Sequence, residues 1–103
     1  MNTDQPSHFS LGKWLVEPSL GKLTADGRTV SIRPREMDLL VYLAEQQGGI
    51  VTADDIITHV WVGVAVTNDS LYFSMSQLRK ALDDVGGEKS LIETLPKRGY
   101  RLV

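Results

Sequence analysis

The sequence NDSLYFSMSQLRKAL, residues 68–82, decides how the rest of the chain is interpreted. Its large apolar residues recur at intervals of four, three and four positions, the spacing that places side chains on one face of an α-helix. These residues are Leu71, Met75, Leu78 and Leu82. At about 100° per residue they form a seam only about 60° wide, which predicts a helix with one narrow buried stripe.

The ends of this helix carry start and stop signals. Thr67 or Asn68 suits the N-cap position, where a side-chain oxygen accepts from a free backbone N–H. Gly86 and Gly87 are typical of the residues that follow a helix, so we expect the helix to run to about Val85.

The opposite side of the same helix is polar and basic. It carries Tyr72, Ser76, Arg79 and Lys80, and it is flanked by Ser74 and Gln77. A phenol, an amide, small hydroxyls and a guanidinium can hydrogen-bond base edges or phosphates in the major groove of DNA. An ordinary solvated helix face explains the same residues, so this helix alone leaves two readings open.

The C-terminal residues favour the first reading. Residues 91–95 and 100–103 are predicted strands, joined by a turn at residues 96–99. Lys97, Arg98 and Arg101 place three positive charges beside Tyr100 without an acid. A tight turn that projects cations can follow a phosphate backbone or enter the minor groove, although a solubilising charged turn would look similar.

Two further helices are predicted upstream. Pro34 suits the first position of one, with the Glu36 carboxylate facing the free N–H groups, and Gly48 and Gly49 end it. The centre of its apolar face is formed by Met37, Leu40, Val41 and Ala44, widened by Leu39 and Leu43. An arc this wide predicts contact with both a sheet and another helix.

The second of these helices begins at Thr52, which is followed three residues later by Asp55, a variant of the capping box. Its inner face is supplied by Ile56, Ile57, Val60 and Trp61. Residues 62–66, VGVAV, then form an apolar loop or a short strand.

The N-terminal third of the chain is predicted to form a β-sheet. Residues 1–7 are predicted to be a disordered lead-in, and residues 8–103 to form one domain. From Phe9 to Ile32, short alternating runs are separated by turn signals, of which Asp26-Gly27 is the strongest. We expect three or four short antiparallel strands here.

Composition limits the function classes. The chain has 103 residues, 42% of them hydrophobic and 23% charged, a net charge of −2 and no cysteine. One core fits this length, and cysteine chemistry is excluded. No apolar run approaches the roughly 18 residues of a spanning helix, and no secretory signal is present. The net charge argues against a sequence-blind nucleic-acid coat, so any polyanion partner depends on local patches.

Catalytic groups are scarce. Asp55 and His59 stand four residues apart and could share a helix face as metal ligands, but two ligands rarely make a site. A surface histidine near a helix end is the simpler reading. No nucleophile, base and oxyanion donor occur together, and no phosphate loop is present, so we expect no enzyme, no cofactor and no small-molecule substrate.

Taken together, the chain resembles the winged helix-turn-helix output domains of the OmpR/PhoB type, and more closely their CadC/ToxR-like branch. The similarity runs from Phe9 to Val103 and is carried by three stretches in order. These are IRPREMDLLVYLAEQQGGIVTADDIITHVW, NDSLYFSMSQLRKAL and LIETLPKRGYRLV. The resemblance implies an α+β fold with an N-terminal four-stranded antiparallel sheet, three helices and a C-terminal β-hairpin wing.

The resemblance also implies site residues. A recognition helix at about residues 68–85 would enter the major groove, and a wing at residues 96–99 would contact the backbone or minor groove. The implied DNA contacts are Thr52, Tyr72, Ser76, Gln77, Arg79, Lys80, Lys97 and Arg98. The loop from Trp61 to Thr67 is where relatives meet RNA polymerase, which would involve Val62, Val64 and Val66, although simple packing also explains these valines.

Three positions depart from the family pattern. Arg33 stands where a Ser or Thr helix cap is usual, Ser76 and Gln77 stand where basic residues are frequent, and Pro96 replaces a wing arginine of some relatives. The two polar replacements predict weaker binding or a different preferred sequence, and Pro96 bears on the depth of minor-groove entry.

The leading hypothesis is therefore a bacterial, sequence-specific DNA-binding domain that regulates transcription at the nucleoid in the cytoplasm. Relatives pair head to tail on direct repeats, which implies weak self-association. The CadC/ToxR-like branch continues into a membrane helix and a sensor, which implies one-component signalling by a parent anchored in the inner membrane. The rival hypotheses are a winged-helix protein-interaction module without DNA binding and a small metal-dependent enzyme that uses Asp55 and His59.

Overall fold

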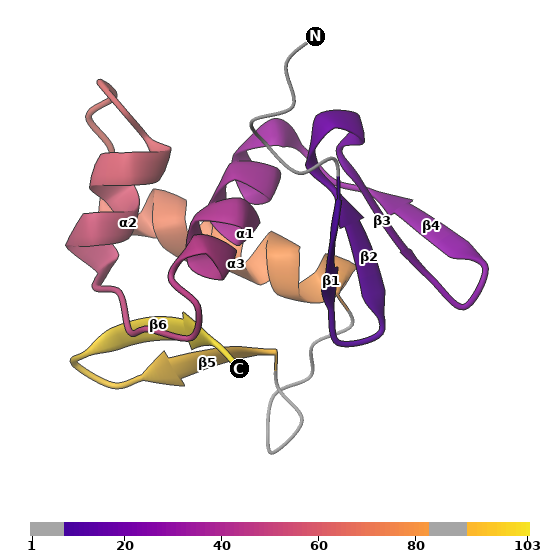
Figure 1. Ribbon diagram of the computed structural model, residues 1–103. Coiled ribbons are helices and arrows are strands. Elements are labelled where there is room, and N and C mark those ends of the chain that lie inside the picture. The colour runs from indigo at the N-terminus through magenta and orange to yellow at the C-terminus, as the bar shows by residue number, and fades with distance from the viewer. Residues whose placement is uncertain (1–7, 83–90) are drawn as a thin grey trace, which may run out of the picture.

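The computed structural model describes residues 8–82 and 91–103. Over these residues the chain forms a four-stranded sheet, three α-helices and a two-stranded hairpin, in that order (Figure 1). The first sheet contains β1 (Phe9–Leu11), β2 (Trp14–Glu17), β3 (Lys22–Ala25) and β4 (Arg28–Ser31), with a 3-10 turn η1 (Pro18–Leu20) between β2 and β3. The helices are α1 (Pro34–Glu45), α2 (Ala53–Val60) and α3 (Asn68–Ala81), and the hairpin is β5 (Ile92–Leu95) and β6 (Gly99–Leu102). The predicted α+β fold is confirmed; the predicted lead-in, residues 1–7, lies outside the described residues.

The N-terminal sheet is antiparallel in the order β1-β2-β3-β4. Asp26 and Gly27 both have positive φ, 53° and 77°, as the hairpin signal requires, and Ala25 pairs with Arg28 across the turn. Alternate side chains on β2 and β3 enter the core, where Trp14 is 1% exposed.

Helix α1 lies at the centre of the molecule and contacts α2, α3, η1 and β6 (Figure 1). Its buried face is rotated from the predicted one: Leu39 and Leu43 are fully buried, whereas Val41 and Ala44 are only partly buried. Met37 and Leu40 of the predicted face are buried as well, so the buried side spans Met37, Leu39, Leu40 and Leu43.

The start of α1 is at Pro34, as predicted, with Glu36 in its first turn, and it contains one contact that was not predicted. The buried carboxylate of Glu36 is held by the side chain of Arg33, whose Nε donates to Oε1 at 2.7 Å and whose Nη2 donates to Oε2 at 3.2 Å. A side-chain pair therefore occupies the position where a hydroxyl cap was missing.

Helix α2 begins as predicted, with the backbone N–H of Asp55 donating to Thr52 Oγ1 at 3.1 Å.

The apolar seam predicted for α3 is also confirmed, since all four of its residues are at most 3% exposed. However, α3 ends at Ala81 rather than near Val85, and Leu82 is its C-cap. The Leu82 carbonyl accepts a hydrogen bond from Trp14 Nε1 at 3.0 Å, which satisfies one of the carbonyls left free at a helix end. Gly86 and Gly87 lie outside the described residues.

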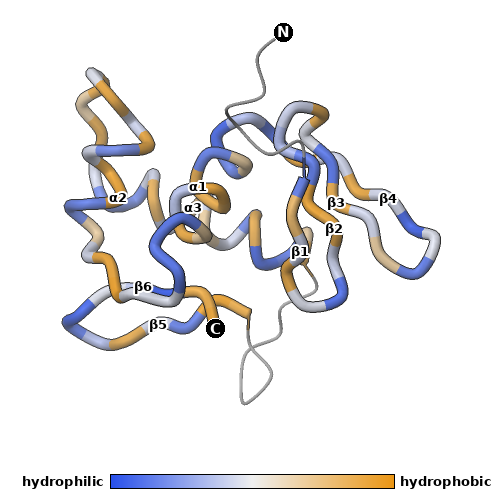
Figure 2. The backbone as a smooth tube through the Cα atoms, viewed as in Figure 1, coloured by the Kyte–Doolittle hydropathy of each residue, from blue (hydrophilic) through white to orange (hydrophobic). Residues whose placement is uncertain are grey.

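The C-terminal hairpin, which we call the wing, is joined to the rest of the chain by backbone hydrogen bonds. The N–H of Val51 donates to the carbonyl of Tyr100, and the N–H of Tyr100 donates to the carbonyl of Val51, both at 2.9 Å. Figure 1 shows the wing lying across the ends of α1 and α2, and Figure 2 shows a hydrophilic turn at its tip.

Residues 62–66 form a loop with no strand. Among the described residues, no helix combines the length and hydropathy needed to cross a lipid bilayer.

Candidate nucleic-acid interface

The cationic turn of the wing and the outer side of α3 open onto one cleft. This cleft has a volume of about 400 Å³ and lies between the start of α2, the side of α3 and the wing. Four of the eight predicted DNA contacts line it: Thr52, Tyr72, Lys97 and Arg98. All four are exposed, and Lys97 has a left-handed backbone, φ 64°, that turns the chain at the tip.

Three other predicted contacts continue along α3 beyond the cleft. Ser76 and Lys80 are exposed, and Gln77 is half-buried at the edge of the same face. The polar side is not exposed throughout, because Ser74, which was predicted to flank it, is only 4% exposed and Arg79 is partly buried.

Arg79 is placed differently from the other predicted contacts. Its Nη2 donates to the carbonyl of Ile92 at 3.0 Å and to Thr94 Oγ1 at 2.6 Å, so its guanidinium joins α3 to β5. Its Nε is buried and has no hydrogen-bond partner among the described residues. This contact depends on how the wing folds back onto the helix, so no local sequence pattern could predict it.

Tyr100, which also lines the cleft, is partly buried. Burial raises the pKa of Tyr100 above its usual value of 10.0, the nearby Tyr72 raises it further, and Arg79 lowers it. The ring of Tyr100 is thus kept neutral between the wing and α3, where its hydroxyl stays a hydrogen-bond donor.

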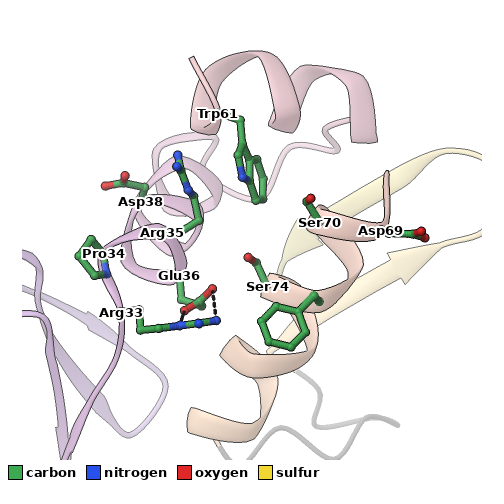
Figure 3. A pocket seen from close by; sticks show the side chains of 10 residues that line it. Arg33, Pro34, Arg35, Glu36, Asp38, Trp61, Asp69, Ser70 and Ser74 are labelled. Atoms are coloured by element: carbon green, nitrogen blue, oxygen red, sulfur yellow. Dashed lines mark hydrogen bonds and ion pairs between the residues drawn. The ribbon is translucent and has the colours of Figure 1, made fainter. Parts of the chain in front are cut away.

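A second hollow, lined in part by Phe73, lies where α3 faces the start of α1 and the end of α2 (Figure 3). Its volume is about 730 Å³. Here the guanidinium of Arg35 lies 5.3 Å from the ring centre of Trp61 and donates to the carbonyl of Val60 at 2.7 Å. The guanidinium of Arg33 lies 5.2 Å from the ring centre of Phe73.

Phe73 was missed by the sequence analysis. Its side chain is 54% exposed, as much as that of Tyr72 at 51%, although both belong to the helix that supplies the core seam. The available signal was its helical position, seven residues before Lys80 and four before Gln77, which places it on the outer face.

The loop between α2 and α3 contains both exposed and partly buried valines. Val62 and Val64 are exposed, at 73% and 49%, so core packing does not explain them. Val66 is partly buried and packs against the core.

His59 contacts the backbone of Asp55 and the ring of Tyr42. Nδ1 of His59 lies 2.8 Å from the backbone carbonyl oxygen of Asp55, and its ring stacks on Tyr42 at 4.9 Å. Within residues 8–82 and 91–103, no three His, Cys, Asp or Glu side chains are grouped as metal ligands.

The chain matches a known protein family and solved structures of the same fold. The family described as "Transcriptional regulatory protein, C terminal" matches residues 27–102. The transcriptional activator CadC of Escherichia coli K12 is 40% identical over 94 residues, which cover 90% of this chain and 18% of CadC. The chain thus spans less than a fifth of that regulator.

Two solved structures are similar over nearly the whole chain. The DNA-binding domain of E. coli CadC superposes with a TM-score of 0.85 at 40% identity, covering 96% of this chain and 92% of that one. The Klebsiella pneumoniae RstA DNA-binding domain, in complex with the RstA box, gives a TM-score of 0.79 at 26% identity, covering 93% and 96%. The chain belongs to the OmpR/PhoB-type winged helix-turn-helix family of transcriptional regulatory proteins and is similar to CadC within it.

Proposed function

We propose that this domain performs the function of its family, sequence-specific binding of double-stranded DNA in transcription regulation, with α3 in the major groove and the wing on the flanking backbone or minor groove. The observation that carries the proposal is the shared cleft: Tyr72 of α3 and the cationic tip of the wing face the same space. A major groove about 12 Å wide admits one helix, and the phosphates beside it then fall within reach of the wing.

The residues divide into two roles. On α3, Tyr72, Ser76, Gln77 and Lys80 are in position to reach base edges, which supplies sequence preference. Around the cleft, Thr52, Lys97 and Arg98 are in position to contact phosphates, which sets the register of the helix on the duplex. The Thr52 hydroxyl oxygen already accepts from Asp55, so its proton is available to a phosphate oxygen.

The protein-interaction alternative is less well supported. It rests on the net charge of −2 and on the two positive side chains of α3. A module of that kind has no need to place Tyr72, Lys97 and Arg98 around one space, whereas a DNA-binding domain does.

Two further partners are part of the proposal. Exposed Val62 and Val64 form an apolar patch on the α2–α3 loop, which suits a contact with RNA polymerase. Weak self-association, with head-to-tail pairing on direct repeats, follows from the family resemblance. With DNA as its partner, the domain works in the cytoplasm at the nucleoid, and we ascribe no catalytic activity to it.

The salt dependence of binding tests the proposal. With about four to six phosphates neutralised, log affinity for a DNA fragment from the protein's own promoter region should fall against log salt with a slope of about −4 to −5. Arg98→Ala should weaken binding to all sequences alike and make the slope shallower by about one unit. Lys22 is an exposed residue of the N-terminal sheet, and Lys22→Ala should leave the salt slope unchanged although it also removes one positive charge.

Gln77→Ala should instead change the ranking of sites while keeping the slope. A wild-type slope near zero would contradict DNA binding. Identical behaviour of Arg98→Ala and Gln77→Ala would contradict the division of roles.

A further inference from the structure

Phe73 is an aromatic side chain in the middle of the polar face of α3. Its neighbours on that face, one helical turn away on either side, are Asp69 and Gln77. More than half of the Phe73 side chain is exposed, so the core does not account for it.

The ring of Phe73 is braced from one side. The Arg33 guanidinium lies 5.2 Å from the ring centre, within the range of a cation–π contact. That guanidinium is itself fixed by two hydrogen bonds to Glu36, whose side chain is buried at the start of α1 (Figure 3). The exposed ring is therefore held by a supported neighbour, which lowers the entropy lost when it contacts a ligand.

The chemical groups that DNA exposes in the major groove determine which of them a phenyl ring can contact. A phenyl group neither donates nor accepts a conventional hydrogen bond, so it cannot read the polar base edges. The apolar group that standard bases present in this groove is the C5 methyl of thymine, and Phe is one of the side chains that contact it.

We propose that Phe73 is a specificity-determining residue that selects thymine at one position of the binding site by packing against its C5 methyl group. This inference rests on the proposed function, since it requires α3 in the major groove. It concerns a residue outside the eight assigned to DNA contact.

Deletion of single methyl groups from DNA tests this contact. A site is first selected by the wild-type domain from a random duplex library, and each thymine is then replaced singly by deoxyuridine, which lacks only the methyl. At one position, or at two adjacent ones, wild-type affinity should fall about fourfold, the worth of burying one methyl group. Phe73→Ala should bind the thymine duplex at least as weakly as the wild type binds the deoxyuridine duplex, and should not distinguish the two.

Two variants serve as controls. Tyr72→Ala removes the adjacent exposed ring, which lines the cleft instead, and should retain the full fourfold methyl effect. Phe73→Leu keeps an apolar side chain and should retain part of it. The melting temperature of Phe73→Ala should be near that of the wild type, because the removed ring is largely exposed.

The outcomes separate this inference from the proposed function. If the wild type selects no sequence, DNA binding itself is wrong. If it selects a site but Phe73→Ala loses affinity on deoxyuridine replacement by the same factor as the wild type, or no thymine is sensitive, the assignment of Phe73 is overturned while DNA binding stands.

Discussion

The two β-structures of this domain both contact the C-terminal part of α3, but in different ways. The N-terminal sheet reaches the end of α3 through Trp14, a fully buried ring whose Nε1 donates to the Leu82 carbonyl. The wing is reached from α3 through Arg79, a half-exposed cation that donates to Ile92 and Thr94. One contact is part of the core and the other lies at the edge of the cleft.

We infer that the contact on the sheet side mainly affects the stability of the domain, whereas the contact on the wing side mainly affects the geometry of the cleft. Trp14 removes a large apolar surface from water, so its contact contributes mainly to the free energy of unfolding. The wing is a two-stranded hairpin, which has little stability of its own. Ile92 and Leu102 anchor it in the core, and hydrogen bonds to Val51 and from Arg79 set its position beside α2 and α3. Changes on the sheet side should therefore lower stability, and changes on the wing side should lower DNA affinity.

The largest effect is expected at Trp14. Trp14→Ala should lower the free energy of unfolding by about 3–5 kcal/mol, because it opens a cavity and leaves the Leu82 carbonyl without its donor. Trp14→Phe keeps most of the ring volume and should fall between this variant and the wild type. Urea titration measures the loss, and DNA affinity measured well below the melting temperature should change little. A loss of affinity without a loss of stability would contradict the assignment of Trp14 to the fold.

Gly99 is the corresponding position on the wing side. A Cβ there would lie 1.9 Å from the Val51 carbonyl oxygen, and the backbone φ is 138°. Gly99→Ala must move β6 away from Val51 and break the two hydrogen bonds between them, which costs about 1–3 kcal/mol. DNA affinity should fall about tenfold or more, because the cationic tip loses its position relative to α3.

Gly27→Ala is the matched control for Gly99→Ala. Gly27 also has a positive φ, 77°, but nothing lies within 4 Å of the added atom. Its substitution should cost about 1 kcal/mol of backbone strain and leave DNA affinity unchanged. If both variants lost affinity equally, strain rather than wing placement would be the cause.

The sequence predicted the features that depend on local order. The seam of α3, the Asp26-Gly27 hairpin and the Thr52 cap each follow from residues that are close together in the sequence, and all three are confirmed. The turn geometry and the helix period decide such features without reference to distant residues.

Apart from Phe73, whose helical position was a local signal, the features that were missed depend on approaches between distant parts of the chain. Gly99 is required because Val51 lies against it, and Arg79 bonds to β5 because the wing folds back over α3. The earlier end of α3 coincides with the hydrogen bond from Trp14. No periodicity encodes these pairings, so a single sequence could not reveal them.

A smaller effect is expected at the Arg79–Thr94 contact, and it decides the role of Arg79. Thr94→Val removes the hydroxyl that accepts from Nη2 and keeps the shape of the side chain. If Arg79 positions the wing, this variant should lower DNA affinity about two- to threefold without changing the salt slope, the effect of about one exposed hydrogen bond. The effects of Arg79→Ala and Thr94→Val should then be less than additive.

The alternative role for Arg79 gives the opposite pattern. If its guanidinium binds a phosphate, Arg79→Ala should make the salt slope shallower by about one unit. Thr94→Val would then release the guanidinium from β5 and leave affinity unchanged or higher.

The smallest effect is expected from the ionisation of Tyr100. Its pKa is raised in the folded state, mainly by burial and further by Tyr72, so folding favours the neutral phenol. This contribution to stability is complete below the unfolded pKa of 10.0 and is lost as the pH rises through the folded pKa. Urea titrations between pH 8 and 11 should therefore show a decline in the free energy of unfolding with rising pH, and this decline should be shallower in Tyr100→Phe.

Tyr42 supplies the comparison, because its pKa is also raised by burial and its ring stacks on His59 of α2, away from the wing. Tyr42→Phe should reduce the decline in stability without protecting DNA binding at high pH. Equal declines in the wild type and Tyr100→Phe would show that the wing does not depend on this neutral ring.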